Sequence, residues 1–492
     1  MIPLPSTDLM VIAPLLVIVC WATLLLLVDL FIIPAERKRI TGYLAIAGFA
    51  VAALVAVPLW GSERSSFSGM VVLDRFSLTL IWIFLLVGAI SAGLALDYLP
   101  KQGIEQGEFY PLLMFAVSGM MVLAQGANLI VIFLGIELLS ITLYVLTGFA
   151  YPRINSEEAG MKYLLLGAFA AGFFVYGIAL IFGQTGTVQL FSADPTQASV
   201  AAYLARQTLA PVDMTLLYVG SGLILIALGF KVSLAPFHMW TPDVYEGAPT
   251  PVTAFMSVGS KGAAFAALIR ILTQTLPTIQ PIWLPVLAGL AVLTMLVGNI
   301  GALVQLNLKR MLAYSSIGHA GYLLLAVMSA STRGTQGFLF YLLIYALTNL
   351  GAFAVVIALE QRDEAAWSLD DFAGLGQRHP FLAVAMAIFM LSLAGVPPTA
   401  GFMGKFYIFT AAWEQGLGSV VLVGVLTSAI AAFFYLRVIV RMFMQEPVRT
   451  VEPQLFQGLT IGIGLAVAGT VIFGLIPTPV IELVTRSVVA GM

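Results

Sequence analysis

The chain has 492 residues, of which 60% are hydrophobic and only 9% charged, and its mean hydropathy is +1.02. No soluble domain of this length stays in solution with that composition, so the sequence predicts an all-α protein that crosses a membrane many times. A net charge of −2 gives no reason to expect nucleic acid as a partner, and a single cysteine excludes a cysteine-ligated zinc or iron–sulfur site.

Windows of about twenty apolar residues predict fourteen transmembrane helices. They lie near residues 9–33, 41–60, 75–96, 109–125, 128–150, 160–183, 215–239, 250–273, 282–305, 309–330, 335–360, 380–412, 417–443 and 457–477. The first apolar run follows no basic segment and has no convincing cleavage site, so we expect a retained helix rather than a signal peptide. Residues 198–209, in the loop after the sixth span, have the pattern of an interfacial amphipathic helix.

Basic residues are distributed unequally between the two sides of the predicted membrane. With the N-terminus outside, eleven fall on the cytoplasmic side, Lys309 and Arg310 among them, and six on the outer side, including Arg270. Five more lie within spans, namely four lysines and Arg437. The positive-inside rule therefore predicts that both termini face the outer side.

Two spans contain residues that interrupt helices. A straight helix over 380–412 would be about 50 Å long, well beyond a hydrocarbon core of about 30 Å, and its middle contains Pro397, Pro398 and nearby glycines. In 215–239, Pro236 removes a backbone donor shortly after Lys231. Corresponding breaks in two halves of a chain are typical of inverted repeats with a transport site between them.

Four of the seven lysines, Lys162, Lys231, Lys261 and Lys405, lie inside apolar spans. An ammonium at the bilayer centre costs about 2.5–3.5 kcal/mol on insertion scales, so intramembrane lysines indicate a water-lined internal path. The sequence therefore predicts an ion-conducting protein.

Glu137 is the one acid that we expect deep within a span, and Lys231 is its expected partner. A nearby carboxylate raises the proton affinity of a buried lysine, so making or breaking the pair would switch that affinity. The alternative is an ion pair that only fixes helix packing.

Lys261 and Lys405 fit hydrated relay positions. Ser257 lies one turn before Lys261 on the same face, and Ser260 with the two glycines, Gly259 and Gly262, is expected to leave room for water. For Lys405, one turn after Gly401, the alternative is an ammonium that snorkels to the interface. Lys162 is near the start of its span, where a surface pair with Glu158 at i,i+4 is as good an explanation as a relay role.

His238 and His319 are able to shuttle protons near neutral pH, although a lone membrane histidine more often serves packing or hydrogen bonding. No metal-ligand spacing connects them with His379. The segment 241–251 is rigid, polar and acidic, which suits a channel mouth or an ordinary proline-rich turn. No Walker motif or dinucleotide fingerprint is present, so the energy must come from an ion gradient or a redox partner.

Three stretches, 230–243, 309–319 and 395–406, closely resemble motifs of the antiporter-like subunits of respiratory complex I. The resemblance covers nearly the whole chain, most clearly residues 110–443. It implies a three-helix segment over 1–108, inverted five-helix repeats over 109–273 and 282–443 with discontinuous seventh and twelfth helices, and a C-terminal helix within 444–492.

The resemblance also implies residue roles. Glu137 would pair with Lys231, Lys261 would be the central relay, and Lys405 would lead toward the outer exit. Lys162 matches a position that the family keeps basic. Lysine at 405 in place of glutamate, together with the lack of a long C-terminal lateral helix, favours one particular branch of the family.

The implied function is proton translocation in a bacterial cytoplasmic membrane, as a subunit of an NADH-quinone oxidoreductase. No cofactor is expected in this chain, because FMN, iron–sulfur clusters and quinone would be held by partner subunits. The implied partners are membrane subunits of the A, H, J, K, L and M types. The main alternative is a subunit of a multisubunit Na⁺/H⁺ antiporter. A stand-alone transporter of an organic solute would predict more polar side chains around the helix breaks.

Overall fold

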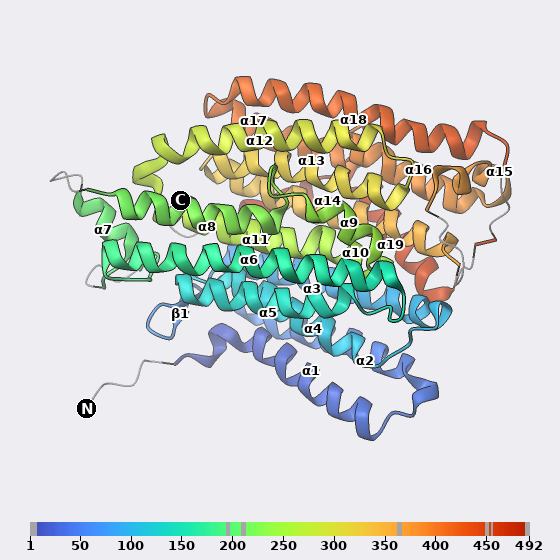
Figure 1. Ribbon diagram of the computed structural model, residues 1–492, viewed down its shortest axis with the longest axis horizontal. Helices are drawn as coiled ribbons and strands as arrows, with labels where there is room; N and C mark the ends of the chain where they lie inside the picture. The colour runs from blue at the N-terminus through green and yellow to red at the C-terminus, as the bar shows by residue number, and fades with distance from the viewer. Residues whose placement is uncertain are drawn as a thin grey trace.

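The computed structural model describes residues 7–192, 197–207, 213–361, 367–447, 452–453 and 456–487. Most of this chain is helical, and the long helices run side by side along one axis (Figure 1). In chain order the helices are η1 (Leu9–Ile12), α1 (Ala13–Phe31), η2 (Ala35–Arg37), α2 (Arg39–Ala56), η3 (Val57–Leu59), α3 (Arg75–Gln102), α4 (Phe109–Gln125), α5 (Leu129–Thr147), α6 (Ile154–Thr185), α7 (Val200–Gln207), α8 (Thr215–Val232), α9 (Trp240–Gly247), α10 (Thr250–Phe255), η4 (Met256–Ser260), α11 (Lys261–Ile269), η5 (Arg270–Thr275), η6 (Pro277–Ile279), α12 (Gln280–Leu303), α13 (Leu308–Met328), α14 (Thr332–Leu359), η7 (Leu369–Phe372), α15 (Leu375–Arg378), α16 (Pro380–Ala394), α17 (Ala400–Glu414), α18 (Gly418–Met444), α19 (Gln457–Leu475) and α20 (Thr478–Thr485). The segments η4 and η5 are π-helical, and the other η segments are 3₁₀.

Two short strands, β1 (Arg64–Ser66) and β2 (Val71–Leu73), form an antiparallel hairpin that the sequence analysis did not predict. Arg64 pairs with Leu73 and Ser66 with Val71. The hairpin and α7 lie at one end of the bundle, while α15 lies at the other (Figure 1). A helix is therefore present where the amphipathic segment was expected, although residues 208–209 of that segment lie outside the described residues.

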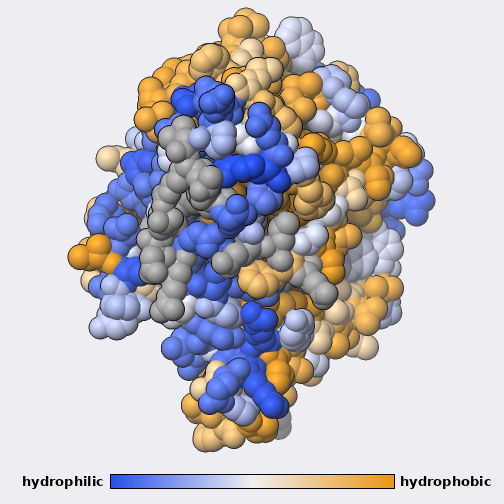
Figure 2. Space-filling view, turned by 90° about the vertical axis from the view of Figure 1, so that its right-hand side faces the viewer, coloured by the Kyte–Doolittle hydropathy of each residue, from blue (hydrophilic) through white to orange (hydrophobic). Residues whose placement is uncertain are grey.

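Twelve helical segments of the described chain are long and apolar enough to cross a membrane. Two other expected spans are shorter helices, namely α4 and α16. Exposed leucine and phenylalanine side chains are found along the flanks of the outer helices, as at Leu30 and Phe31. The end of the bundle seen in Figure 2 carries many hydrophilic side chains, with hydrophobic ones around them. The polytopic all-α fold is confirmed, whereas the count of fourteen and the repeat boundaries stay predictions.

The most deeply buried span is the segment from Thr250 to Thr275, whose apolar window is wholly enclosed by other helices. It consists of α10, η4, α11 and η5, with α13 and α14 nearly as buried beside it. The π-helical turn η4 ends directly before Lys261. Such wide turns occur frequently at functional sites in helices.

Both predicted helix breaks are confirmed. Helix α8 ends at Val232, Ser233 has a φ of +64°, and the chain re-enters a helix as α9. Helix α16 ends at Ala394, Gly395 has a φ of +84°, and α17 begins at Ala400. A residue in the left-handed region ends a helix by turning the chain away from the helical path.

Candidate functional site

Three of the four predicted intramembrane lysines are buried inside the bundle. Lys231, Lys261 and Lys405 are 4%, 2% and 5% exposed, so none of them faces the surrounding lipid. The snorkelling alternative for Lys405 is therefore wrong. The side chain of Lys162, in contrast, is 40% exposed.

Lys231 occupies the last turn of α8, directly before the first break. Its ammonium donates a hydrogen bond to Tyr163 Oη at 3.2 Å. It also lies 4.8 Å from the ring centroid of Tyr163 and 5.5 Å from that of Tyr144. Aromatic faces attract a cation, and most strongly where water is excluded.

The predicted contact between Glu137 and Lys231 is not formed. Glu137 Oε1 is buried without a hydrogen-bond partner among the described residues, and the ammonium of Lys231 binds Tyr163 instead. The two charges are still close enough to interact electrostatically. Glu137 therefore acts on Lys231 through space in this conformation rather than by direct ion pairing.

Lys261 lies at the centre of the bundle, where it donates a hydrogen bond to Ser316 Oγ of α13. Its ammonium is 5.7 Å from the ring centroid of Tyr245. Both neighbouring glycines lie close against side chains of other helices. A Cβ on Gly259 would lie 2.8 Å from Met120 Sδ, and one on Gly262 would lie 2.9 Å from Leu342, so these glycines allow close helix packing.

Lys405 reaches across the second break to the carboxyl end of α16. Its ammonium donates to the carbonyl oxygens of Leu393 at 2.9 Å and Ala394 at 3.0 Å, and to Ser428 Oγ at 2.8 Å. The last carbonyls of a helix lack intrahelical partners and carry the negative end of its dipole. Gly401 makes this approach possible, because a Cβ there would lie 1.9 Å from the carbonyl oxygen of Ser392.

His319 of α13 lies near both Lys261 and Lys405. Its Nδ1 is hydrogen-bonded to Tyr341 Oη, and its Nε2 is 3.0 Å from Tyr435 Oη. Tyr435 Oη is in turn hydrogen-bonded to Ser315 Oγ of α13. The positive charges of Lys261 and Lys405 both act on the imidazole.

His238 is in the first break, between α8 and α9. It is not part of the hydrogen-bonded group around His319. His319 is therefore the histidine that is hydrogen-bonded to tyrosines near the lysines, while the charge of Lys261 acts on both imidazoles.

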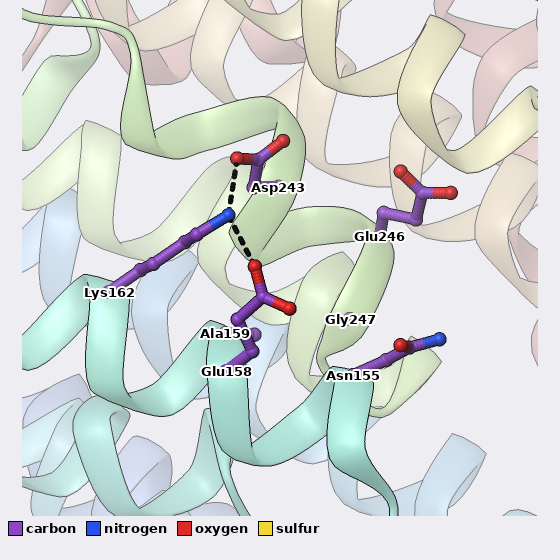
Figure 3. Close-up of a pocket in the computed structure, with 7 residues that line it drawn as sticks. All are labelled: Asn155, Glu158, Ala159, Lys162, Asp243, Glu246 and Gly247. Atoms are coloured by element: carbon purple, nitrogen blue, oxygen red, sulfur yellow. Dashed lines mark hydrogen bonds and ion pairs between the residues drawn. The ribbon is translucent and has the colours of Figure 1, made fainter.

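Lys162 lines a polar cavity of about 210 Å³ between α6 and α9 (Figure 3). It forms the predicted i,i+4 pair with Glu158 at 2.6 Å and a second pair with Asp243 at 2.8 Å. Arg310 of α13 contacts Asp243 at 2.8 Å and Glu246 at 2.9 Å. The acidic segment 241–251 is thus part of an ion-pair network, and much of it forms helix α9 rather than a simple turn.

Several buried charged residues were not expected from the sequence, and three of them are basic or acidic residues at the ends of long helical segments. Lys309 and Arg270, both assigned to loops, are 0% exposed, and Glu360 at the end of α14 is 2% exposed. Arg270 donates to Asp74 Oδ1 at 2.8 Å and to the carbonyl of Ala124 at 2.8 Å. All three residues lie at the edges of apolar windows, where hydropathy does not distinguish an enclosed side chain from a solvated one. In the described part of the chain, no three His, Cys, Asp or Glu side chains are arranged to hold a metal ion.

Comparison with known proteins agrees with this arrangement. Residues 126–431 match the family model described as NADH:quinone oxidoreductase/Mrp antiporter, TM. A Chloroflexus aggregans protein named NADH-quinone oxidoreductase subunit N is 66% identical over 487 residues, covering 99% of this chain and 98% of the relative. A Roseiflexus castenholzii protein named NADH-quinone oxidoreductase subunit N 2 is 56% identical, covering 100% of this chain and 98% of the relative.

A chain of Thermus thermophilus respiratory complex I with bound aureothin superposes with a TM-score of 0.81 at 34% identity, covering 96% of this chain and 99% of that one. The branch favoured by lysine at 405 is thus that of subunit N. The sequence matches and the arrangement of broken helices lead to one assignment: the chain belongs to the NADH:quinone oxidoreductase/Mrp antiporter transmembrane family.

Proposed function

We propose that this chain is the proton-translocating subunit N of an NADH-quinone oxidoreductase, and that protons pass along its row of buried lysines. The observation that carries the proposal is that Lys231, Lys261 and Lys405 are all enclosed by protein within an apolar bundle. Buried intramembrane charges are expensive and mark ion pathways by default. Electron transfer from NADH to quinone takes place in other subunits and would drive the proton movement through this chain.

The first half of the path runs from Lys231 to Lys261. Lys231 contacts Tyr163, whose ring stacks on Trp240 at 4.5 Å. The ring centroids of Trp240 and Tyr245 are 6.1 Å apart, and the ammonium of Lys261 faces the Tyr245 ring. The carboxylate of Glu137, whose Oε1 has no hydrogen-bond partner among the described residues, would be the negative charge to which Lys231 responds.

The second half runs from Lys261 to Lys405 through α13. Ser316 accepts the hydrogen bond of Lys261, and its neighbour Ser315 joins Tyr435 and His319. Like charges repel strongly where water is scarce, so a proton arriving at one lysine favours release from the next. This repulsion makes stepwise transfer toward Lys405 and the outer side possible. Lys162 and His238 would assist at the cytoplasmic mouth and at the first break.

The chain spans a membrane many times and would assemble with other membrane subunits. We further propose that these are subunits of the A, H, J, K, L and M types in a bacterial cytoplasmic membrane, with both termini of this chain outside. FMN, iron–sulfur clusters and quinone would be bound by partner subunits. The antiporter alternative shares the fold: a chain of the Mrp complex from a Dietzia species superposes with a TM-score of 0.81 at 23% identity.

Lys261→Ala in the intact complex tests the path. We expect NADH-driven proton uptake by inverted membrane vesicles to fall at least about tenfold, since a positioned proton-transfer group typically contributes about 10²–10⁴-fold to a rate. The matched control is Arg206→Ala, which removes an exposed cation on α7. The variant is purified first, and it should be recovered with flavin- and iron–sulfur-containing subunits. Recovery with small membrane subunits only, or wild-type proton uptake by the assembled variant, would overturn the proposal.

A further inference from the structure

Glu360 is a buried carboxylate that the proposed path does not use. It is 2% exposed and follows the last residue of α14. Its Oε1 accepts a hydrogen bond from Tyr98 Oη at 2.9 Å, and its Oε2 accepts one from Thr250 Oγ1. Thr250 is the first residue of α10, so the carboxylate lies at the positive end of that helix.

Two lysines lie around this carboxylate. Lys309 is fully buried, donates to the carbonyl of Ala248 at 2.9 Å and lies 4.2 Å from the ring centroid of Trp367. Lys101, on α3, is half-buried and reaches the carbonyls of Ile357 and Ala358 at 3.4 Å each. The charge of Glu360 acts on both ammoniums. Because Lys101 is partly exposed, the cluster connects the end of the bundle with a buried acid.

The environment of the cluster includes charges from every neighbouring element. Tyr98 and Lys101 come from α3, Thr250 from α10, and Lys309 from α13. Glu246 of α9 and Arg153, just before α6, also act electrostatically on Lys309. Glu360 is a carboxylate hydrogen-bonded at the start of the segment that carries Lys261.

Buried polar groups continue from this cluster toward Lys261. Thr250 and Lys261 are eleven residues apart, which is about 16 Å along a helix. Between them lie Thr253 and Ser257, both 0% exposed, and Ser257 Oγ accepts a hydrogen bond from Asn349 Nδ2. Asn349 Oδ1 is buried without a partner among the described residues. Buried polar atoms of this kind are where internal water binds.

We propose that Glu360, with Lys309 and Lys101, is a proton-loading site that supplies Lys261 along the polar face of α10 and η4. The inference rests on the proposed function, because it assigns the source of the protons that Lys261 passes on. The carboxylate accepts hydrogen bonds from two hydroxyl groups, and the surface-facing lysine provides exchange with water. Glu360 takes up a proton on the cytoplasmic side and releases it inward through the hydroxyl groups and bound water.

Glu360→Gln in the intact complex tests this site, since glutamine keeps the size of the side chain and removes its titratable group. We expect fewer protons to be taken up per NADH oxidised, and the pH profile of the remaining coupled rate to differ from wild type. Glu360→Asp should restore part of the uptake. The matched control is Glu108→Gln, an exposed acid just before α4, which should behave as wild type.

A Glu360→Gln complex that pumps at the wild-type stoichiometry would overturn the proposal, as would lower uptake with an unchanged pH profile, which marks a structural tie. If that variant does not assemble, Thr250→Val removes the hydroxyl donor and leaves the acid in place. It should shift the same pH profile, and an unshifted profile would count against the site. If Lys261→Ala loses uptake while both cluster variants keep it, only this inference fails. If Lys261→Ala also keeps it, the proposed function fails with it.

Discussion

The two helix breaks contain similar residues, but the ammonium groups of their lysines have different contacts. At the first break, Lys231 precedes the interruption and its ammonium faces aromatic rings and one phenol hydroxyl. At the second, Lys405 follows the interruption and its ammonium is bonded to two main-chain carbonyls and a hydroxyl. The side of the break on which the lysine lies therefore decides whether it meets side chains or a helix end.

This difference predicts different freedom for the two charges. A helix end has fixed, oriented carbonyl groups. The ammonium of Lys405 is therefore stabilised by the main chain and depends little on the positions of neighbouring side chains. The ammonium of Lys231 is surrounded by aromatic rings and interacts with the carboxylate of Glu137 without direct contact. Lys231 is consequently the better placed of the two to respond to a movement elsewhere, and Lys405 is the better placed to hold the second break together.

Lys405→Ala and Lys231→Ala should separate these roles, and this is the largest effect we expect. Both variants should lose most NADH-driven proton uptake. Lys405→Ala should also lower thermal stability, because each buried carbonyl left without a partner costs about 1–3 kcal/mol. Lys231→Ala leaves only the Tyr163 hydroxyl unpaired and should change stability less. Thermal inactivation of the purified complexes measures the difference, and equal midpoints would show that the helix-end contacts do not stabilise the break.

Glu137→Ala provides the comparison for the first break. If the carboxylate acts only through its charge on Lys231, this variant should assemble and still lose proton uptake. An assembled Glu137→Ala complex with full uptake would remove the acid from the switching role.

A smaller effect is expected from the turn residues themselves. Gly395→Ala should destabilise the second break by about 1–2 kcal/mol, because a side chain in the left-handed region clashes with its own backbone. The added Cβ would also lie 3.0 Å from Lys405 Cδ. At the first break, Ser233→Gly removes that strain but also the hydroxyl that accepts from Thr241 Oγ1 at 2.8 Å, so its effect should be near zero. Thermal inactivation again measures both, and a neutral Gly395→Ala would contradict the comparison.

The breaks and the buried lysines could be predicted because their signals are strong and local. Prolines and glycines in the middle of an overlong apolar stretch leave few helical alternatives, and a lysine in such a stretch must be enclosed or reach the surface. The contact of Glu137 could not be predicted in the same way. Which residue an ammonium meets depends on the rotation and packing of helices, and Tyr163 of α6 took the place expected for the acid.

Glu360, Lys309 and Arg270 show a second limit of the sequence. Each lies at the end of an apolar window, where a charged residue usually faces water or lipid headgroups. Their burial arises from segments far away in the chain, such as Tyr98 against Glu360 and Asp74 against Arg270. The π-helical turn before Lys261 was also beyond prediction, since its residues suit an α-helix equally well. The inverted repeats remain a prediction.

Lys162→Ala should have the smallest effect. Its side chain is 40% exposed, and exposed ion pairs contribute only about 0–1 kcal/mol. Asp243 keeps Arg310 as a partner at 2.8 Å, so α9 and the first break should stay in place.

We expect proton uptake to fall less than about threefold, because a threefold change in rate corresponds to about 0.7 kcal/mol, within the range for exposed ion pairs. Arg310→Ala is the matched comparison, because it removes an ion-pair partner from both Asp243 and Glu246. A Lys162→Ala complex as impaired as Lys405→Ala would instead show that protons pass through Lys162 itself, because the loss of an exposed ion pair alone is too small to produce such an effect.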